Sequence, residues 1–125
     1  SSFLGKHMAL SFDQLTDTKV LNIANQMMDS LMQASIEKDY AKHIQYFSQR
    51  AKSTLDETQF KIICGVYQEK MGIFTEREFV KLFWRPESVA VIWTQKYSQV
   101  EGEYVAEMVM LIEDDQYRVD HAFVF

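Results

Sequence analysis

The chain has 125 residues, of which 47% are hydrophobic and 25% are charged, and its formal net charge is −5. This is the composition of one ordinary globular domain rather than of a disordered, fibrous or multidomain chain. It argues against non-specific nucleic-acid binding, since phosphate contacts need clustered cations, and the apolar runs fall far short of the roughly 18 residues that span a bilayer. The single cysteine, Cys64, permits neither an internal disulfide nor a cysteine-rich zinc site.

Residues 1–8 have the character of a leader left by cloning. They lack the charged stretch followed by a long apolar stretch that a secretory signal needs. His7-Met8 is what a common restriction site leaves before a start codon, so we expect residues 9–125 to form one domain. A start without a signal predicts a cytoplasmic protein, although a chain trimmed of its signal would look the same.

The N-terminal part of the domain predicts three helices. From about residue 17 to residue 38, apolar residues recur at three- and four-residue steps, which is the pattern of an amphipathic helix. A short second helix follows, capped by Asp39. The third helix is predicted to begin at Thr54-Leu55-Asp56-Glu57, which can form a capping box, and to end at Gly72.

From Glu76 onward the hydrophobic pattern alternates, which predicts strands at about residues 76–85, 88–99, 103–113 and 116–125. Two-residue connections at Pro86-Glu87, Glu101-Gly102 and Asp114-Asp115 make consecutive strands antiparallel neighbours in a meander. The predicted class is therefore α+β, with three N-terminal helices packed on a four-stranded antiparallel sheet.

Short turns fix the register of a meander, and the register decides which side chains share a face. With two residues in each turn, the face assigned to the helices carries Val80, Leu82, Trp84, Val89, Val91, Trp93, Gln95, Tyr97, Tyr104, Ala106, Met108, Met110, Ile112, Tyr117, Val119, His121 and Phe123. The outward face carries Phe79, Lys81, Phe83, Ala90, Ile92, Thr94, Lys96, Val105, Glu107, Val109, Leu111, Arg118, Asp120, Ala122 and Val124. This register places Lys96 directly across from Glu107, an opposite-charge pair.

Three sequence features carry a family resemblance: Asp39-Tyr40-Ala41 with Phe47-Ser48, the helix start from Thr54 to Phe60, and Gln116-Tyr117-Arg118-Val119 leading to Phe123. With the helix-then-meander order, the chain from about residue 17 to residue 125 resembles the nuclear transport factor two-like superfamily, of cystatin-like fold. The resemblance is closest to small uncharacterised bacterial domains. It implies a curved, cone-like sheet, a conical pocket for any ligand and a homodimer.

We expect this pocket to be lined by aromatic rings and a few polar side chains. The expected lining is Tyr40, Phe47, Phe60, Cys64 and Tyr67 from the helices, with Trp93, Gln95, Tyr97, Met108 and His121 from the sheet. Such a wall suits a flat, mostly apolar ligand with one polar end. No carboxylate lies in the middle of the inward face, so the base that ketosteroid isomerase chemistry needs is missing.

His121 is the one candidate for catalysis, because an imidazole on an apolar strand face can act as an acid or a base. A strand histidine between apolar neighbours is more often a hydrogen-bonded core residue. An isomerase, dehydratase or cyclase using His121 with Tyr97 or Tyr40 therefore stays open as an alternative. Finding His121 on the face of Glu107 would overturn the register and favour this enzyme.

A second alternative is a scaffold whose pocket is filled by Trp84, Trp93, Phe60 and Met108. Neither a metal nor another cofactor is expected, because the sequence has no His-x-x-x-His, no Cys-x-x-Cys and no clustered acidic set.

The outward face would leave a large apolar patch in water, which monomers rarely do. A sheet-to-sheet homodimer is the simplest cover, with a predicted interface of Phe79, Phe83, Ala90, Ile92, Thr94, Val109 and Leu111. The sequence thus predicts a non-enzymatic dimeric domain that binds a small apolar ligand or a protein partner. It predicts no nucleic-acid or membrane partner.

Overall fold

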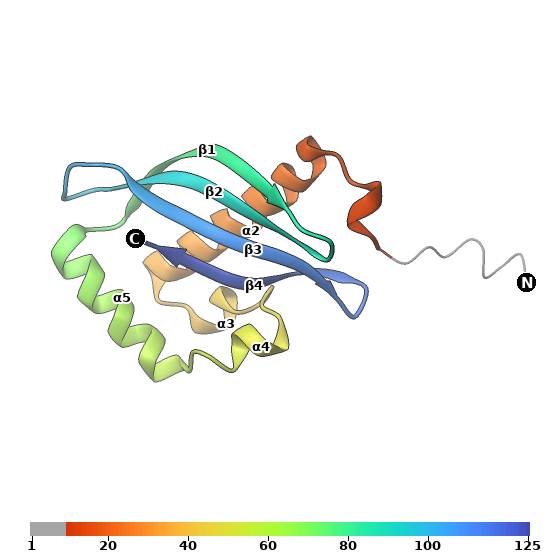
Figure 1. Ribbon diagram of the computed structural model, residues 1–125. Helices are drawn as coiled ribbons and strands as arrows, with labels where there is room; N and C mark the ends of the chain where they lie inside the picture. The colour runs from red at the N-terminus through yellow and green to blue at the C-terminus, as the bar shows by residue number, and fades with distance from the viewer. Residues whose placement is uncertain (1–9) are drawn as a thin grey trace, which may run out of the picture.

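A computed structural model describes residues 10–125, and the predicted leader at residues 1–8 lies outside this part (Figure 1). The elements are η1 (Phe12–Gln14), α2 (Asp17–Glu37), α3 (Tyr40–His43), α4 (Gln49–Lys52), α5 (Glu57–Met71), β1 (Phe74–Trp84), β2 (Ser88–Tyr97), β3 (Tyr104–Glu113) and β4 (Gln116–Val124). The strands form one antiparallel sheet in the order β1-β2-β3-β4. The predicted α+β class, with helices ahead of an antiparallel meander, is confirmed. Among residues 10–125, no helix is both long and apolar enough to cross a membrane.

The long helix α2 supplies most of the helical side of the core. Thr16 caps its start, because the side-chain oxygen accepts the amide hydrogen of Lys19 at 3.2 Å. Its buried stripe is Val20, Ala24, Met27, Met28, Leu31 and Met32. In Figure 1 the helix crosses behind the curved sheet, and its stripe joins the inward residues of β2 and β3 in one cluster.

Two short helices stand where one was predicted, and the third helix begins later than predicted. α4 was missed, and Thr54 closes it by donating its hydroxyl to the Ala51 carbonyl at 2.7 Å. The capping box of α5 is formed by Asp56 and Gln59, which exchange side-chain to backbone bonds of 2.8 and 3.2 Å. The end of this helix at Gly72 is as predicted.

Gly72 joins α5 to β1 with a backbone that other residues rarely adopt. Its φ is +86°, and a Cβ there would lie 2.1 Å from Ser98 Oγ and 3.0 Å from the Gln99 nitrogen. Gly72→Ala should therefore lower the free energy of unfolding by about 2 kcal/mol in urea denaturation. The matched control is Gly65→Ala within α5, where a Cβ meets nothing within 4 Å and helix propensity predicts a gain of about 1 kcal/mol. Equal changes in unfolding free energy for the two substitutions would contradict close packing at the junction of α5 with β1.

The first and last turns of the meander are as predicted. Trp84 lies opposite Val89, and Glu113 lies opposite Gln116. Asp114 and Asp115 have φ values of 52° and 57°, as the two central residues of a type I′ turn require.

The middle turn is longer than predicted, which corrects the pairing of β2 with β3. The amides of Ser98 and Gln99 bond to the carbonyls of Ile73 and Met71 at the junction of α5 with β1, and the pairing of β2 with β3 ends at Gln95 and Tyr104. Glu107 consequently lies opposite Ile92 rather than Lys96, a shift of 96 − 92 = 4 positions. An even shift leaves the faces of β2 and β3 as predicted.

A bulge at Val80 reverses the faces of β1 over residues 77–79, whereas Leu82, Phe83 and Trp84 keep their predicted faces. The register shifts between Phe79 and Lys81, so that Phe79 lies opposite Trp93. Phe79 was expected on the outward face, and the structure places it on the face of α2, while Val80 is 55% exposed. One extra residue in a strand is enough to exchange its two faces.

A second bulge, at Asp120, reverses the end of β4. His121 lies opposite Val109 and Phe123 lies opposite Glu107, so both turn to the outward face. Ala122 and Val124 take their places on the inward face and pack against the core. The prediction that His121 and Phe123 point inward is therefore wrong.

Candidate functional site

An open cavity of about 490 Å³ lies between α5, α2 and the β4 edge of the sheet. Its apolar lining is Met28, Leu31, Met32, Phe47, Ala51, Leu55, Phe60, Ile63, Phe74, Ala122, Phe123 and Val124. Its polar lining is Ser35, His43, Arg50, Thr54, Cys64, Tyr67, Tyr97, Asp120 and His121. A mostly apolar cavity of this size with a few polar groups is typical of small-molecule sites.

The cavity exists because α5 is held at its ends and stands off the sheet. At its start, the Tyr40 hydroxyl donates to the Leu55 carbonyl at 2.6 Å. Towards its end, the Gln68 amide donates to the Ser35 carbonyl at 3.0 Å. Between these anchors only Phe60 and Cys64 are buried, so the core side chains of α2 and the sheet do not fill the space beneath the helix.

One end of the cavity is aromatic. The ring of Phe74 stacks on Tyr67 with 5.0 Å between centroids and lies 5.1 Å from the ring of Tyr97, which meets Tyr104 edge-on at 5.1 Å. Burial, with the neighbouring Tyr67 and Tyr104 hydroxyls, raises the pKa of Tyr97 to about 12, and burial also raises the pKa of Tyr67. Both phenols are therefore protonated donors at neutral pH.

The Ser35 hydroxyl lies between Tyr67 and Cys64 on the cavity wall. It bonds to the Tyr67 hydroxyl and lies 3.4 Å from the Cys64 sulfur. Burial raises the pKa of the Cys64 thiol, which keeps it protonated and weakly nucleophilic.

His43 is a neutral imidazole on the cavity wall. Its ring centroid lies 4.5 Å from that of Phe60 and 5.4 Å from that of Phe47. Burial among these rings lowers the pKa of His43 to about 4. Nδ1 is buried and has no hydrogen-bond partner among the described residues.

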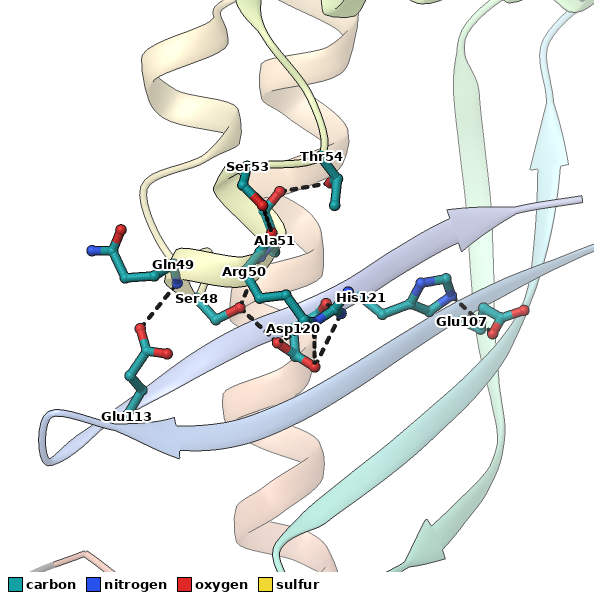
Figure 2. Close-up of polar contacts among 10 residues, drawn as sticks. All are labelled: Ser48, Gln49, Arg50, Ala51, Ser53, Thr54, Glu107, Glu113, Asp120 and His121. Carbon is teal, nitrogen blue, oxygen red and sulfur yellow. Dashed lines mark hydrogen bonds and ion pairs between the residues drawn. The ribbon is translucent and has the colours of Figure 1, made fainter.

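A polar cluster joins Arg50 and Asp120 of the cavity wall to the buried Ser48 (Figure 2). Ser48 Oγ donates to Asp120 Oδ1 at 2.7 Å, and Arg50 Nε and Nη2 donate to the carboxylate at 3.0 to 3.2 Å. Burial alone would raise the pKa of Asp120, but the bonds from Arg50 and Ser48 outweigh it and hold that pKa below its usual value. This carboxylate is thus an occupied acceptor rather than an available base.

His121 and Glu107 meet on the outward face of β3 and β4 (Figure 2). The imidazole Nε2 lies 3.1 Å from Glu107 Oε2. His121 therefore lies on the same face as Glu107. The reason is that the bulge turns the imidazole outward, whereas Glu107 stays on its predicted face. His121 is nevertheless among the residues that line the cavity.

The expected pocket residues fall into two groups. Phe47, Phe60, Cys64, Tyr67, Tyr97 and His121 line the cavity. Tyr40, Trp93, Gln95 and Met108 do not: the Tyr40 ring lies behind Phe60, and the other three are buried at 1% exposure or less beneath the helices. The sheet wall of the cavity is therefore Phe74, Tyr97 and the end of β4, not the centre of the sheet.

Several cavity residues were not predicted from the sequence: Ser35, Arg50, Thr54 and Asp120. Arg50 and Asp120 approach each other because residues 46–48 run beside β4, where Phe47 bridges Val119. The polar pattern of this stretch carries no local signal for that pairing. No group of three or more His, Cys, Asp or Glu side chains within residues 10–125 could hold a metal ion.

The outward sheet face carries most of the predicted interface. Phe83, Ala90, Ile92, Thr94, Val109 and Leu111 lie on it, joined by Val105, Phe123 and Phe125. Phe83, Phe123 and Phe125 are 47%, 57% and 57% exposed. Lys96 reaches Glu76 on β1, at 3.6 Å, instead of Glu107.

Comparisons with known proteins bear on the fold. No family model matches the chain, and no curated protein matches it significantly. A SEC-C motif containing protein from Rhodopseudomonas palustris is similar in structure, with a TM-score of 0.57, 11% identity, and coverage of 78% of this chain and 74% of that one. Bd1075 from Bdellovibrio bacteriovorus gives 0.54 at 13% identity, over 88% of this chain but 42% of Bd1075. At such identities these matches show a shared fold and nothing more.

Proposed function

We propose that this chain is a non-enzymatic binding domain of the nuclear transport factor two-like superfamily, and that its cavity takes a small, mostly apolar ligand or apolar side chains of a protein partner. The observation that carries the proposal is the open cavity of about 490 Å³ between α5 and β4. The order of helices before a curved antiparallel meander supports the superfamily. The scaffold alternative loses support, because Trp93 and Met108 fill the core under the helices and leave this cavity open.

The lining suits a ligand with an apolar body and one polar end. Phe60, Ile63 and Met32 offer apolar contact along the middle of the cavity. The protonated hydroxyl of Tyr97 offers a hydrogen-bond donor at the aromatic end. A flat ring system with an acceptor group at that end satisfies both.

Three polar groups at the cavity are poorly suited to act as general bases at neutral pH. Asp120 is bonded to Ser48 and Arg50, His43 has a pKa of about 4, and the pKa of Cys64 is raised. A general base works best with a pKa near the operating pH and within hydrogen-bond reach of the proton it takes.

The enzyme alternative rests on the contact of His121 with Glu107, since a carboxylate can orient an imidazole. The Tyr40 hydroxyl, one of its expected partners, is bonded to the Leu55 carbonyl instead. Turnover of enolisable ketones or hydroxyacyl compounds that His121→Ala lowers by about 100-fold or more, in a folded variant, would favour this alternative over the binding domain.

Binding can be measured with the fluorescent apolar probe 1-anilinonaphthalene-8-sulfonate. We expect one probe per chain at the cavity, and Ala122→Phe, which fills the cavity from β4, should weaken binding by about tenfold or more. The matched control is Ala41→Phe, because Ala41 is exposed on α3 outside the cavity. Equal binding to both variants, each shown to be folded by its unfolding transition, would contradict the cavity as the site.

The outward sheet face is proposed as a homodimer interface. Ile92 lies in the middle of its apolar residues, between Lys81 on β1 and Glu107 on β3. Ile92→Asp should convert a dimer to a monomer in sedimentation at micromolar concentration, because it places an unpaired charge in the interface. Ile62→Asp is the control, since Ile62 is 60% exposed on α5. A wild-type protein that sediments as a monomer, or an Ile92→Asp variant that stays dimeric, would contradict the proposed interface.

A further inference from the structure

The cavity opens beside a stretch of β4 whose edge is unpaired. Val105 and Phe125 exchange two backbone hydrogen bonds of 2.6 and 2.9 Å, which fixes the alternation along β4. His121 and Phe123 also direct their N–H and C=O groups towards β3, and Ala122 and Val124 direct theirs away from it. Among residues 10–125, no group bonds these outward N–H and C=O groups of Ala122 and Val124.

The preceding part of this edge already takes an extended segment. The Val119 amide donates to the Tyr46 carbonyl at 2.7 Å, and the Ser48 amide donates to the Val119 carbonyl at 2.9 Å. Residues 46–48 thus run parallel to β4 until α4 leads the chain away and Arg50 takes the Asp120 carbonyl. The edge of β4 is unpaired from Ala122 onward, because residues 46–48 pair only with the part of β4 around Val119.

The open edge and the cavity face the same space. The side chains of Ala122 and Val124 point inward and line the cavity, and Ile63 of α5, 54% exposed, lines it from the other side. In Figure 1 the end of β4 lies along the α5 side of the sheet. A strand laid on this edge would therefore place every second side chain over an apolar cavity.

The other edge of the sheet lacks these properties. β1 has two register irregularities and carries Glu76, Arg77, Glu78 and Lys81. Bulges and charges are the common means by which proteins prevent pairing at a sheet edge. The sequence Ala122-Phe123-Val124-Phe125 has neither a charge nor a proline, so the β4 edge carries no such protection.

We propose that the β4 edge accepts an extended peptide segment of a partner protein. Its main chain pairs with the outward groups of Ala122 and Val124, and its apolar side chains at alternate positions enter the cavity. This inference rests on the proposed function, because it names the occupant of the same cavity. The unpaired backbone groups favour this occupant over a small apolar molecule, because a peptide main chain can pair with them.

The experiment selects peptides of roughly ten residues from a random displayed library against the full chain. We expect the enriched sequences to carry apolar residues at every second position. A fluorescein-labelled selected peptide should bind the wild type, and Val124→Pro should weaken it by about tenfold or more, because proline removes an outward N–H donor. Val124→Ala, which keeps that donor, should weaken it less.

Amide hydrogen exchange of the wild type tests the pairing without a substitution. Saturating peptide should slow exchange at Ala122 and Val124 by about tenfold or more. The outward amide of Leu82 on the β1 edge is the internal control and should not change.

Each outcome separates the two proposals. If the naphthalene probe binds and no peptide is enriched, the cavity remains the proposed binding site and the peptide proposal is overturned. The peptide proposal is also overturned if a bound peptide leaves the Ala122 and Val124 amides unprotected. If the protection of these amides rises with protein concentration in the absence of peptide, the edge pairs with a second copy of the chain. That result would also overturn the peptide proposal. If neither the naphthalene probe nor any peptide binds, the proposal that the cavity is a binding site is overturned as well.

Discussion

Trp93→Ala is expected to lower the free energy of unfolding by about 3–5 kcal/mol, while a variant that remains folded keeps its affinity for the naphthalene probe. Trp93 is 1% exposed, and its indole nitrogen donates to Asn25 of α2 at 2.9 Å. The Arg77 guanidinium lies 5.2 Å from the ring centroid on the same face and forms an ion pair with Asp29. Removing the indole therefore empties a space in the core rather than widening the cavity.

The matched control for this substitution is Trp84→Ala. Trp84 is 42% exposed and also bonds to α2, through its indole nitrogen and Asp17 at 2.9 Å, so we expect a loss of about 1–2 kcal/mol. Urea denaturation measures both variants. Equal losses for the two tryptophans, or loss of probe binding in folded Trp93→Ala, would show that Trp93 is not a core residue separate from the site.

Acidification from pH 6.5 to pH 4 is expected to destabilise the domain by up to about 3 kcal/mol through His43 alone. Its pKa is lowered from 6.5 to about 4 by burial. Between these values the unfolded chain binds a proton that the folded chain does not, so the contribution of His43 to stability rises with pH across this window and levels off above it. Asp120 also has a lowered pKa, but its effect lies below its ordinary value of 3.8.

His43→Leu removes this contribution, so its unfolding free energy should depend less on pH between 4 and 6.5 than that of the wild type. Urea denaturation at several pH values gives the two slopes. A direct check is the NMR titration of the His43 ring protons in the folded protein. Equal slopes, or a ring that titrates near its ordinary value, would contradict the buried neutral imidazole.

Periodicity was sufficient to predict the long elements. The stripe of α2 and the alternation of β2 and β3 depend on contacts that recur at fixed steps along the chain, and the burial of Met28, Val91 and Met110 follows those steps. Asp114-Asp115 was also recognisable as a two-residue turn, because the alternating strands on both sides end there.

The bulges were harder to predict, because each adds one residue without interrupting the strand. Phe79-Val80 does place two large apolar residues side by side, which strict alternation does not allow, and it was the available signal for the first bulge. At Asp120 the alternation is preserved in either register, so the reversal of His121 is visible only in the three-dimensional structure.

The cavity could be anticipated only in part. Phe60, Cys64 and Tyr67 were predicted to face it because they share one stripe of α5. Its other wall depends on how far α5 stands from the sheet, and on Phe47 bridging Val119 across the chain. These are long-range properties, and no local spacing encodes them.

The measurement that tests the cavity most directly is the set of intermolecular nuclear Overhauser contacts between the bound naphthalene probe and the methyl and ring protons of the domain. We predict contacts with Ile63 and Tyr67 of α5 and with Ala122 of β4, which line the cavity from both sides. Contacts confined to Phe83 and Ile92 on the outward face, or no saturable binding, would contradict the account.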